Sequence, residues 1–247
     1  MISVCIATYN GGAFIKRQLY SILPQLGEND EVVIADDGST DDTLPIIESL
    51  NDKRIKIIEG PHRHSPIWNF ERALKAAKGD YIFLSDQDDE WMPNKVKVTL
   101  PYLKTADCVV SDNIVIDDED HIISDSFYKL NGTRNGKFYN LLIKNGYLGC
   151  CMAFNRKVLD KSLPFPHNTP MHDIWIGNVA AFHYTVQFIP EKLIKFCRHG
   201  DNASTTAAKS EYCAWKKIKF RLNIVKDLIL QSVKQRKDEN ACMASAK

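Results

Sequence analysis

The sequence predicts an α/β fold with a mainly parallel central sheet flanked by helices. Up to about residue 105, short apolar runs alternate with segments whose apolar residues recur at helical spacing. Strands separated by helices of this length are typical of a parallel sheet with covering helices. Three of the apolar runs end in polar clusters, and ligands of such sheets collect at the carboxyl ends of the strands. With 247 residues, 44% of them apolar, the chain can form one large domain with a sizeable core.

The first half contains four predicted strands and three predicted helices. Apolar runs predict the strands at 2–7, 31–35, 55–58 and 81–84. The third helix is expected over residues 68–77, and the first two carry apolar residues at Phe14, Leu19, Ile22 and Leu23 and at Leu44, Ile46, Ile47 and Leu50. Ser39 stands three residues before Asp42, which is the spacing of a capping box, so we expect the second helix to begin at Ser39.

The second half has a looser pattern. Short strands are expected at 108–111, 114–116 and 150–154, the last holding the Cys150 and Cys151 thiols, and a hairpin around Pro190 is expected from 185–189 and 193–197. Between Lys209 and Lys237, nine Lys or Arg residues accompany two acids. Apolar residues recur there at helical spacing, which predicts a basic amphipathic helix, and the last ten residues are expected to fray.

Composition excludes several classes of protein. The formal net charge of +1 excludes a globally basic nucleic-acid binder. Seven scattered cysteines, the absence of a recognisable signal peptide and the lack of a long apolar stretch favour a cytoplasmic protein with reduced thiols. Neither a G-x-G-x-x-G nor a Walker A sequence is present, which argues against a dinucleotide enzyme and a P-loop phosphotransferase.

An acidic cluster follows the fourth predicted strand directly. Asp86, Asp88 and Asp89 crowd three carboxylates into four residues, which is unfavourable unless a cation lies among them. Mg²⁺ and Mn²⁺ prefer oxygen ligands and bridge carboxylates to diphosphate oxygens. The alternative is a solvated acidic turn, but the position of the cluster at a strand end favours metal binding.

Two further polar clusters lie at the same predicted edge. Thr8, Tyr9 and Asn10 follow the first strand, where backbone amides and an aromatic face could receive a nucleobase. Asp37 follows the second strand, and its carboxylate could accept hydrogen bonds from a base or a ribose. The alternative for this segment is a simple turn in which Ser39 caps the next helix.

These motifs, in this order, resemble glycosyltransferase family 2. The matching segments are Cys-Ile-Ala-Thr-Tyr-Asn-Gly, Ile-Ala-Asp-Asp-Gly-Ser-Thr-Asp and Gly-Asp-Tyr-Ile-Phe-Leu-Ser-Asp-Gln-Asp-Asp-Glu-Trp. The last is especially similar to the rhamnosyltransferase and capsule or lipopolysaccharide branches of bacteria. The resemblance implies a GT-A, Rossmann-like fold and inverting transfer of a sugar from a nucleotide-diphosphate donor. It also implies that Asp37 lies near the base, Asp86 near the ribose or metal, and that Asp88 is a metal ligand.

The family also has a catalytic base at the start of a helix in its second half. Met-His-Asp-Ile-Trp at 171–175 matches that place, and Asp173 would remove the proton of the acceptor hydroxyl. The alternative is that Asp173 only caps the helix. The resemblance further suggests His199 as a metal or diphosphate ligand, and the Gly-rich segment 146–149 as part of the acceptor cleft.

The expected organisation has three parts. Residues 1–105 would bind the nucleotide sugar, residues 106–205 would form the acceptor-binding and catalytic half, and residues 206–247 would form the basic helix and tail. The expected function is transfer from a UDP- or dTDP-sugar to a hydroxyl of a glycan or lipid-linked acceptor, with Mn²⁺ or Mg²⁺ as cofactor and peripheral contact with the inner membrane. The alternatives are a sugar-nucleotide nucleotidyltransferase and a non-catalytic nucleotide- or glycan-binding module.

Overall fold

The computed structural model describes residues 1–60, 63–198 and 213–245. Its strands are β1 (Ile2–Thr8), β2 (Glu31–Asp36), β3 (Ile55–Glu59), β4 (Tyr81–Asp86), β5 (Glu90–Trp91), β6 (Cys108–Asp117), β7 (Ile122–Ser124), β8 (Met152–Asn155) and β9 (Val186–Arg198). Among the described residues these strands form one sheet in the order β3–β2–β1–β4–β8–β6–β9–β5, with β7 paired to β6.

The sheet is mainly parallel, as the sequence predicts. Strands β1 to β4 run parallel to one another, and β6 runs parallel to β9. Strand β8 lies antiparallel between β4 and β6 and so joins the two halves of the chain in one sheet. All six residues of β2 are buried, which is expected for a parallel strand covered on both faces.

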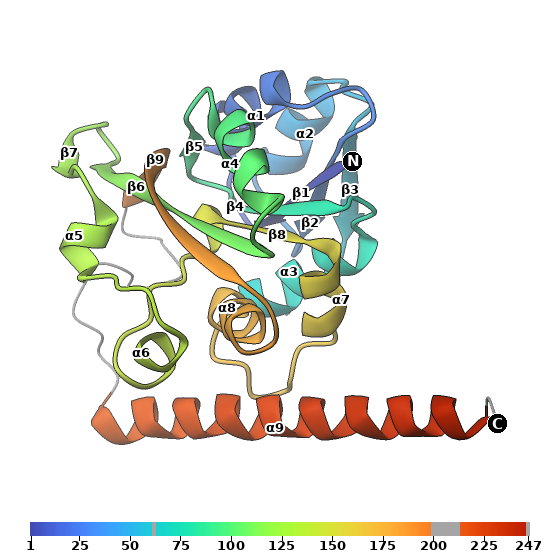
Figure 1. Cartoon of the computed structure of the whole chain (residues 1–247). Helices are drawn as coiled ribbons and strands as arrows, with labels where there is room; N and C mark the ends of the chain where they lie inside the picture. Colours follow the sequence, from blue (N-terminus) through green and yellow to red (C-terminus); the bar gives the residue numbers. More distant parts are fainter. Residues whose placement is uncertain (61–62, 199–212, 246–247) are drawn as a thin grey trace.

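Helices cover both faces of this sheet (Figure 1). One face carries α1 (Ile15–Ile22), α2 (Thr43–Ser49) and α4 (Lys95–Leu103), and the other carries α3 (Pro66–Ala76), α7 (Arg156–Ser162) and α8 (His172–His183). The short helices α5 (Phe127–Asn131) and α6 (Lys137–Leu142) follow β6 and β7, and two 3-10 turns are η1 (Leu23–Gln25) and η2 (Gly149–Cys151). The long helix α9 (Ala214–Ser245) runs beneath α8 along one edge of the molecule.

Two predicted strand breaks are wrong. Residues 108–117 form the single strand β6, and its register shifts at Asp112, where the Asp112 carboxylate accepts hydrogen bonds from the backbone of Asn113 and Tyr128. The predicted hairpin around Pro190 is instead the single strand β9. Ile189 pairs with Ser111 and Lys192 with Asp112, so Pro190 lies in a bulge. Its missing backbone N–H therefore removes no hydrogen bond between β6 and β9.

Helix and strand boundaries also differ from the prediction at three places. Helix α2 begins at Thr43, because the Ser39 hydroxyl donates to Asp36 at 2.6 Å and Ser39 caps no helix. Cys150 and Cys151 lie in η2, before β8, because the chain turns there to enter the sheet. Helix α9 continues to Ser245, so the expected fraying of the last ten residues is wrong for 238–245.

The described helices include none that is both long enough and apolar enough to cross a bilayer.

Candidate active site

The carboxyl ends of β1, β2 and β4 lie next to one another in the sheet. Thr8, at the end of β1, pairs with Asp36 of β2, and Ala7 pairs with Asp86 at the end of β4. The loops that follow these strands therefore start from one edge. The predicted convergence of three polar strand ends is confirmed, and a ligand at this edge would meet all three loops.

The loop after β1 is tied to the loop after β4. The Tyr9 backbone N–H donates to Gln87 Oε1 at 2.9 Å, and Gln87 Nε2 donates to the Tyr9 carbonyl at 3.2 Å. A Cβ on Gly11 would come within 2.5 Å of the same Gln87 oxygen, so a larger residue there would displace the Gln87 side chain. The Tyr9 side chain is 41% exposed and meets the His64 ring edge to face, with centroids 4.8 Å apart. An open aromatic face thus lies beside the strand ends.

The other polar residues of the first two loops are bonded to the protein. The Thr8 hydroxyl donates to Asp36 at 2.9 Å, and the Asn10 side-chain oxygen accepts from the Thr40 backbone at 2.8 Å. The two oxygens of the buried Asp37 accept from the backbone N–H groups of Arg63 and Ser65, at 2.9 and 3.0 Å. These bonds order the loops, and each Asp37 oxygen retains a second lone pair for a ligand.

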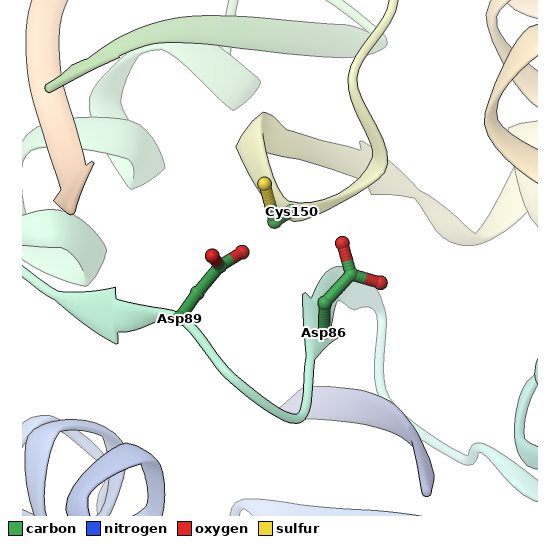
Figure 2. A group of neighbouring side chains, drawn as sticks. All are labelled: Asp86, Asp89 and Cys150. Carbon is green, nitrogen blue, oxygen red and sulfur yellow. The ribbon is translucent and has the colours of Figure 1, made fainter. Parts of the chain in front are cut away.

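Asp86, Asp89 and Cys150 gather at the end of β4 (Figure 2). One ligand atom of each lies within 4.8 Å of the others. The two carboxylates come from the two ends of one short loop, and Cys150 comes from η2. The Asp89 Oδ1 atom accepts from the Cys197 backbone at 3.1 Å, whereas its buried Oδ2 has no hydrogen-bond partner among the described residues. A buried carboxylate oxygen without a partner is costly, so this oxygen is suited to a cation.

Burial and mutual repulsion govern the charge of this cluster. Burial, followed by the charges of Asp88 and Asp173, raises the pKa of Asp86 well above its usual value. Burial, followed by the charges of Asp88 and Asp86, raises the pKa of Asp89 in the same way. Burial also raises the pKa of the Cys150 thiol. The acids therefore hold protons more tightly than exposed acids do, and a divalent cation would restore their ionised form.

Lys95 is the buried cation next to the cluster. It is 1% exposed, its Nζ donates to the Cys150 carbonyl at 2.7 Å, and it lies over the Trp91 ring at 4.9 Å from the centroid. Burial lowers its pKa, while the nearby thiols and Asp89 favour the charged form. Lys95 thus fixes η2, the turn that carries Cys150, against the loop after β4.

Asp173 lies at the first turn of α8, facing η2. Its Oδ2 accepts from the Gly149 backbone N–H at 3.1 Å and its Oδ1 from the Ile174 N–H at 2.7 Å. Burial raises the pKa of Asp173 to about 6, although these backbone bonds oppose the rise. A carboxylate held by two amides and poised near neutral pH has the properties of a general base.

His172, beside Asp173, has a different character. Its ring is buried and stacks on Phe70 of α3 with centroids 3.9 Å apart. Burial lowers the pKa of His172 to about 3, so the ring is neutral at physiological pH. It packs α8 against α3 and does not supply a charge.

The structure brings together the acids that the sequence placed in separate halves. Asp173 is near enough to Asp86 for its charge to raise the Asp86 pKa, and Asp88 lies between Asp86 and Asp89 in the same loop. His199, the other predicted metal ligand, lies outside the described residues. Sequence reasoning missed Cys150 and Lys95, because no spacing in the chain indicates that η2 folds over the end of β4. It missed Gln87, because no spacing indicates that its side chain bonds to the loop after β1.

Comparisons with known proteins identify the family of the chain. The family model for glycosyl transferase family 2 matches residues 3–163. The UDP-Glc:alpha-D-GlcNAc-diphosphoundecaprenol beta-1,3-glucosyltransferase WfaP of Escherichia coli is 29% identical over 167 residues, which cover 68% of this chain and 65% of WfaP. The chain thus spans slightly less than two thirds of that relative.

Two solved structures share the fold. Staphylococcus aureus TarS 1–349 in complex with UDP-GlcNAc has a TM-score of 0.66 at 18% identity, over 93% of this chain and 66% of TarS. The mannosyltransferase PcManGT of Pyrobaculum calidifontis, in complex with GDP-Man and Mn²⁺, has a TM-score of 0.59 at 21% identity, over 94% of this chain and 64% of that one. The expected fold class is confirmed. Because the family model covers most of the chain, and the fold agrees with it, the protein belongs to glycosyltransferase family 2.

Proposed function

We propose that the chain is an inverting glycosyltransferase that moves a sugar from a UDP- or dTDP-sugar to a hydroxyl of a glycan or lipid-linked acceptor. The observation that carries this proposal is the hydrogen bond from the Gly149 amide of η2 to Asp173 on α8, because the next residue of η2, Cys150, lies in one cluster with Asp86 and Asp89. A base thus lies opposite a site for a diphosphate. The names of relatives such as WfaP support a place in bacterial surface polysaccharide synthesis.

Asp173 is proposed to be the catalytic base. Its ionised carboxylate would take the proton of the acceptor hydroxyl as that oxygen bonds to the anomeric carbon and the bond to the diphosphate breaks on the opposite face. The bonds from the Gly149 and Ile174 amides hold the carboxylate in a fixed orientation. This arrangement lowers the entropic cost of reaching the reacting geometry.

The acidic cluster fits a hard divalent cation, Mn²⁺ or Mg²⁺. Asp86 and Asp89 offer carboxylate oxygens in the cluster, and the buried Asp89 Oδ2 has no partner among the described residues. Asp88, which lies between them in the same loop, is proposed as a ligand from the family resemblance. When bound, the ion would neutralise charge on the diphosphate as it leaves. The Cys150 thiol has a raised pKa and is a poor ligand for hard ions, so we assign it the role of a neutral neighbour of Asp89. His199 remains a proposed further ligand.

The donor nucleotide is proposed to lie across the loops after β1 and β2. The exposed Tyr9 ring would stack on the base, with Asn10 and Thr8 shaping the loop. Asp37 would accept hydrogen bonds from the base and Asp86 from the ribose. Nucleic acid is not proposed as a partner, because the net charge of the chain is only +1.

A hydrolysis screen over nucleotide sugars, with Mn²⁺, Mg²⁺ or a chelator, tests this proposal. We expect slow hydrolysis of one donor, dependent on the metal. A nucleotidyltransferase would instead release pyrophosphate from a nucleoside triphosphate, and a binding module would hydrolyse no donor. Either result would overturn the assignment.

The variant Asp173→Asn tests the base. Transfer should fall about a hundredfold or more, because no ionised group then takes the proton. Nucleotide affinity should be unchanged. The melting temperature should fall slightly, because the Asn amide NH2 cannot accept one of the two bonds that the carboxylate accepts from the Gly149 and Ile174 amides. The matched control is Asp160→Asn, an exposed acid on α7. Equal turnover of Asp173→Asn and wild type would show that Asp173 is not the catalytic base.

A further inference from the structure

Helix α9 has two apolar sides. Ile224 and Leu228 are 4% and 6% exposed, and they form the side that packs against the rest of the molecule. A second set of apolar side chains is exposed: Trp215 at 75%, Leu222 at 61% and Ile229 at 57%, together with Ile218 and Val233. A helix that packs by one side and is apolar on the other has more exposed apolar surface than a monomeric protein needs.

The exposed set forms one stripe along the helix. Trp215, Leu222 and Ile229 are seven residues apart, and Ile218 and Val233 lie at spacings of three and four from them. At about 100° per residue these positions fall on one side, roughly opposite Ile224. We call Trp215, Ile218, Leu222, Ile229 and Val233 the outer stripe of α9.

Basic residues border the outer stripe. Lys219 and Lys226 are exposed and follow Ile218 and Val225 by one residue, which puts both lysines along one margin of the stripe. From Trp215 to Val233 the helix carries one acid, Asp227. An apolar side with an aromatic residue and a basic margin is typical of helices that lie in the interface of a membrane.

The surface next to α9 is also basic. Arg221 Nη2 donates to the Ile143 carbonyl at 2.7 Å, so the end of α6 lies next to α9. Leu142 and Ile143 are more than half exposed. The segment 134–144, which contains α6, holds three exposed basic residues, Arg134, Lys137 and Lys144, and no Asp or Glu. Helix α6 therefore adds a basic and partly apolar surface next to α9.

The place of α9 in the fold leaves its outer side accessible. The helix runs along one edge of the molecule, with the sheet and the other helices on its inner side (Figure 1). The helix can therefore lie flat against an extended surface.

We propose that the outer stripe of α9 docks the protein on an anionic lipid bilayer, with the apolar side chains in the headgroup region and the lysines against lipid phosphates. Charge complementarity favours this partner over a second copy of the chain. Two stripes packed together would bring lysine margins together, with only Asp227 as an acid in this stretch of each helix. A lipid surface supplies the negative charge that the helix lacks.

The inference deepens the proposed function, on which its biological meaning rests, since a lipid-linked acceptor would be met at such a surface. The binding itself is measured without donor or acceptor. Loss of vesicle binding would leave donor hydrolysis in solution unchanged, and failure of hydrolysis would leave vesicle binding unchanged. The two proposals can therefore fail separately.

The test is co-sedimentation of the full chain with vesicles of phosphatidylglycerol and phosphatidylcholine, and with vesicles of phosphatidylcholine alone. We expect binding to the anionic vesicles that weakens as salt is added. The double variant Leu222→Glu/Ile229→Glu should bind at least tenfold more weakly, because each Leu or Ile that leaves water contributes roughly tenfold or more. The matched control is Ile122→Glu/Ile123→Glu on β7, where the side chains are 66% and 54% exposed.

A second pair of variants tests the charge. Lys219→Gln/Lys226→Gln should lose about fivefold per lysine on anionic vesicles at low salt. The matched pair Lys97→Gln/Lys104→Gln, exposed on and after α4, should bind like wild type. The proposal would be overturned if the wild-type protein did not bind anionic vesicles. A dimer, seen by sedimentation, that Leu222→Glu/Ile229→Glu converts to monomer while vesicle binding persists would also overturn it.

Discussion

The Asp173 carboxylate differs from an exposed aspartate in both its burial and its bonding. The amides of Gly149 and Ile174 satisfy its oxygens, and burial nevertheless raises its pKa to about 6. Burial therefore dominates over hydrogen bonding at this residue. The result is a carboxylate that is basic enough to accept a proton and still mostly ionised at pH 7.

The pH dependence of transfer should report this pKa. A base acts only when deprotonated, so the rate should fall as pH drops below about 6, by about tenfold per pH unit once protonation dominates. The measurement is kcat/KM for transfer as a function of pH, with nucleotide affinity measured alongside it. A rate that stays level through this range, with affinity also level, would contradict the role of Asp173.

A side chain at Gly149 would press on the first turn of α8. A Cβ there would lie 2.9 Å from His172 Nε2 and 3.5 Å from Asp173 Cβ. Gly149→Ala should therefore shift Asp173 and lower kcat roughly tenfold to a hundredfold, since small misplacements of a base are costly. Donor affinity should change little.

Gly27→Ala is the control for this substitution, because an added Cβ at Gly27 would make only an ordinary contact with Asp30 at 3.5 Å. If Gly149→Ala and Gly27→Ala turn over at the same rate, the close packing of η2 against α8 does not position the base.

At the scale of elements, η2 is the connection on which the site depends. It carries the Gly149 amide that binds Asp173 and the Cys150 thiol that faces Asp86 and Asp89. Strand β8, which follows it, pairs with both β4 and β6. Because β8 lies between these strands, η2 is held over the end of β4.

Lys95→Met should destabilise this connection. The change removes a charged hydrogen bond to the Cys150 carbonyl and leaves that buried carbonyl without its donor. We expect the free energy of unfolding to fall by about 2 to 3 kcal/mol. Urea unfolding measures it, with Lys97→Met, at an exposed site on the same helix, as the control. Superimposable unfolding curves for the two variants would show that Lys95 contributes nothing to stability.

Local pattern predicted some elements and failed at others for identifiable reasons. Strands β1, β2 and β4 are continuous apolar runs, so their positions follow from sequence alone. Strand β9 does not, because Pro190 is a local signal for a turn, and pairing with β6 on both sides of the bulge outweighs it. The start of α2 was misplaced because Ser39 bonds to Asp36, a competing partner that the spacing with Asp42 does not reveal.

At the scale of the whole molecule, one sheet carries residues from both halves of the chain. The proposed donor site lies on strands β1, β2 and β4, and the proposed base follows β8. The division at residue 105 is therefore a division of proposed function within a continuous sheet. Ligand binding in the first half should therefore stabilise the entire fold against unfolding.

Binding of a nucleoside diphosphate with Mn²⁺ should raise the melting temperature in a single transition. A ligand at a hundred times its Kd stabilises the folded state by about 2.7 kcal/mol. Because β4 pairs directly with β8, we expect both halves to unfold together. Scanning calorimetry of the protein in the presence of UDP or dTDP, each with and without Mn²⁺, tests this. Two transitions, of which only one shifts, would show that the halves unfold independently.

The sequence by itself determined the parallel strands, the polar ends of β1, β2 and β4, and the amphipathic character of α9. Each of these follows from residues near one another in the chain, through periodicity or strand-end position. Only the tertiary structure decided that Cys150 and Asp173 reach the acids after β4, that Lys95 lies buried beside them, and which side of α9 remains exposed. These contacts join residues far apart in sequence, and the order in which strands pair, which no local pattern specifies, brings them together.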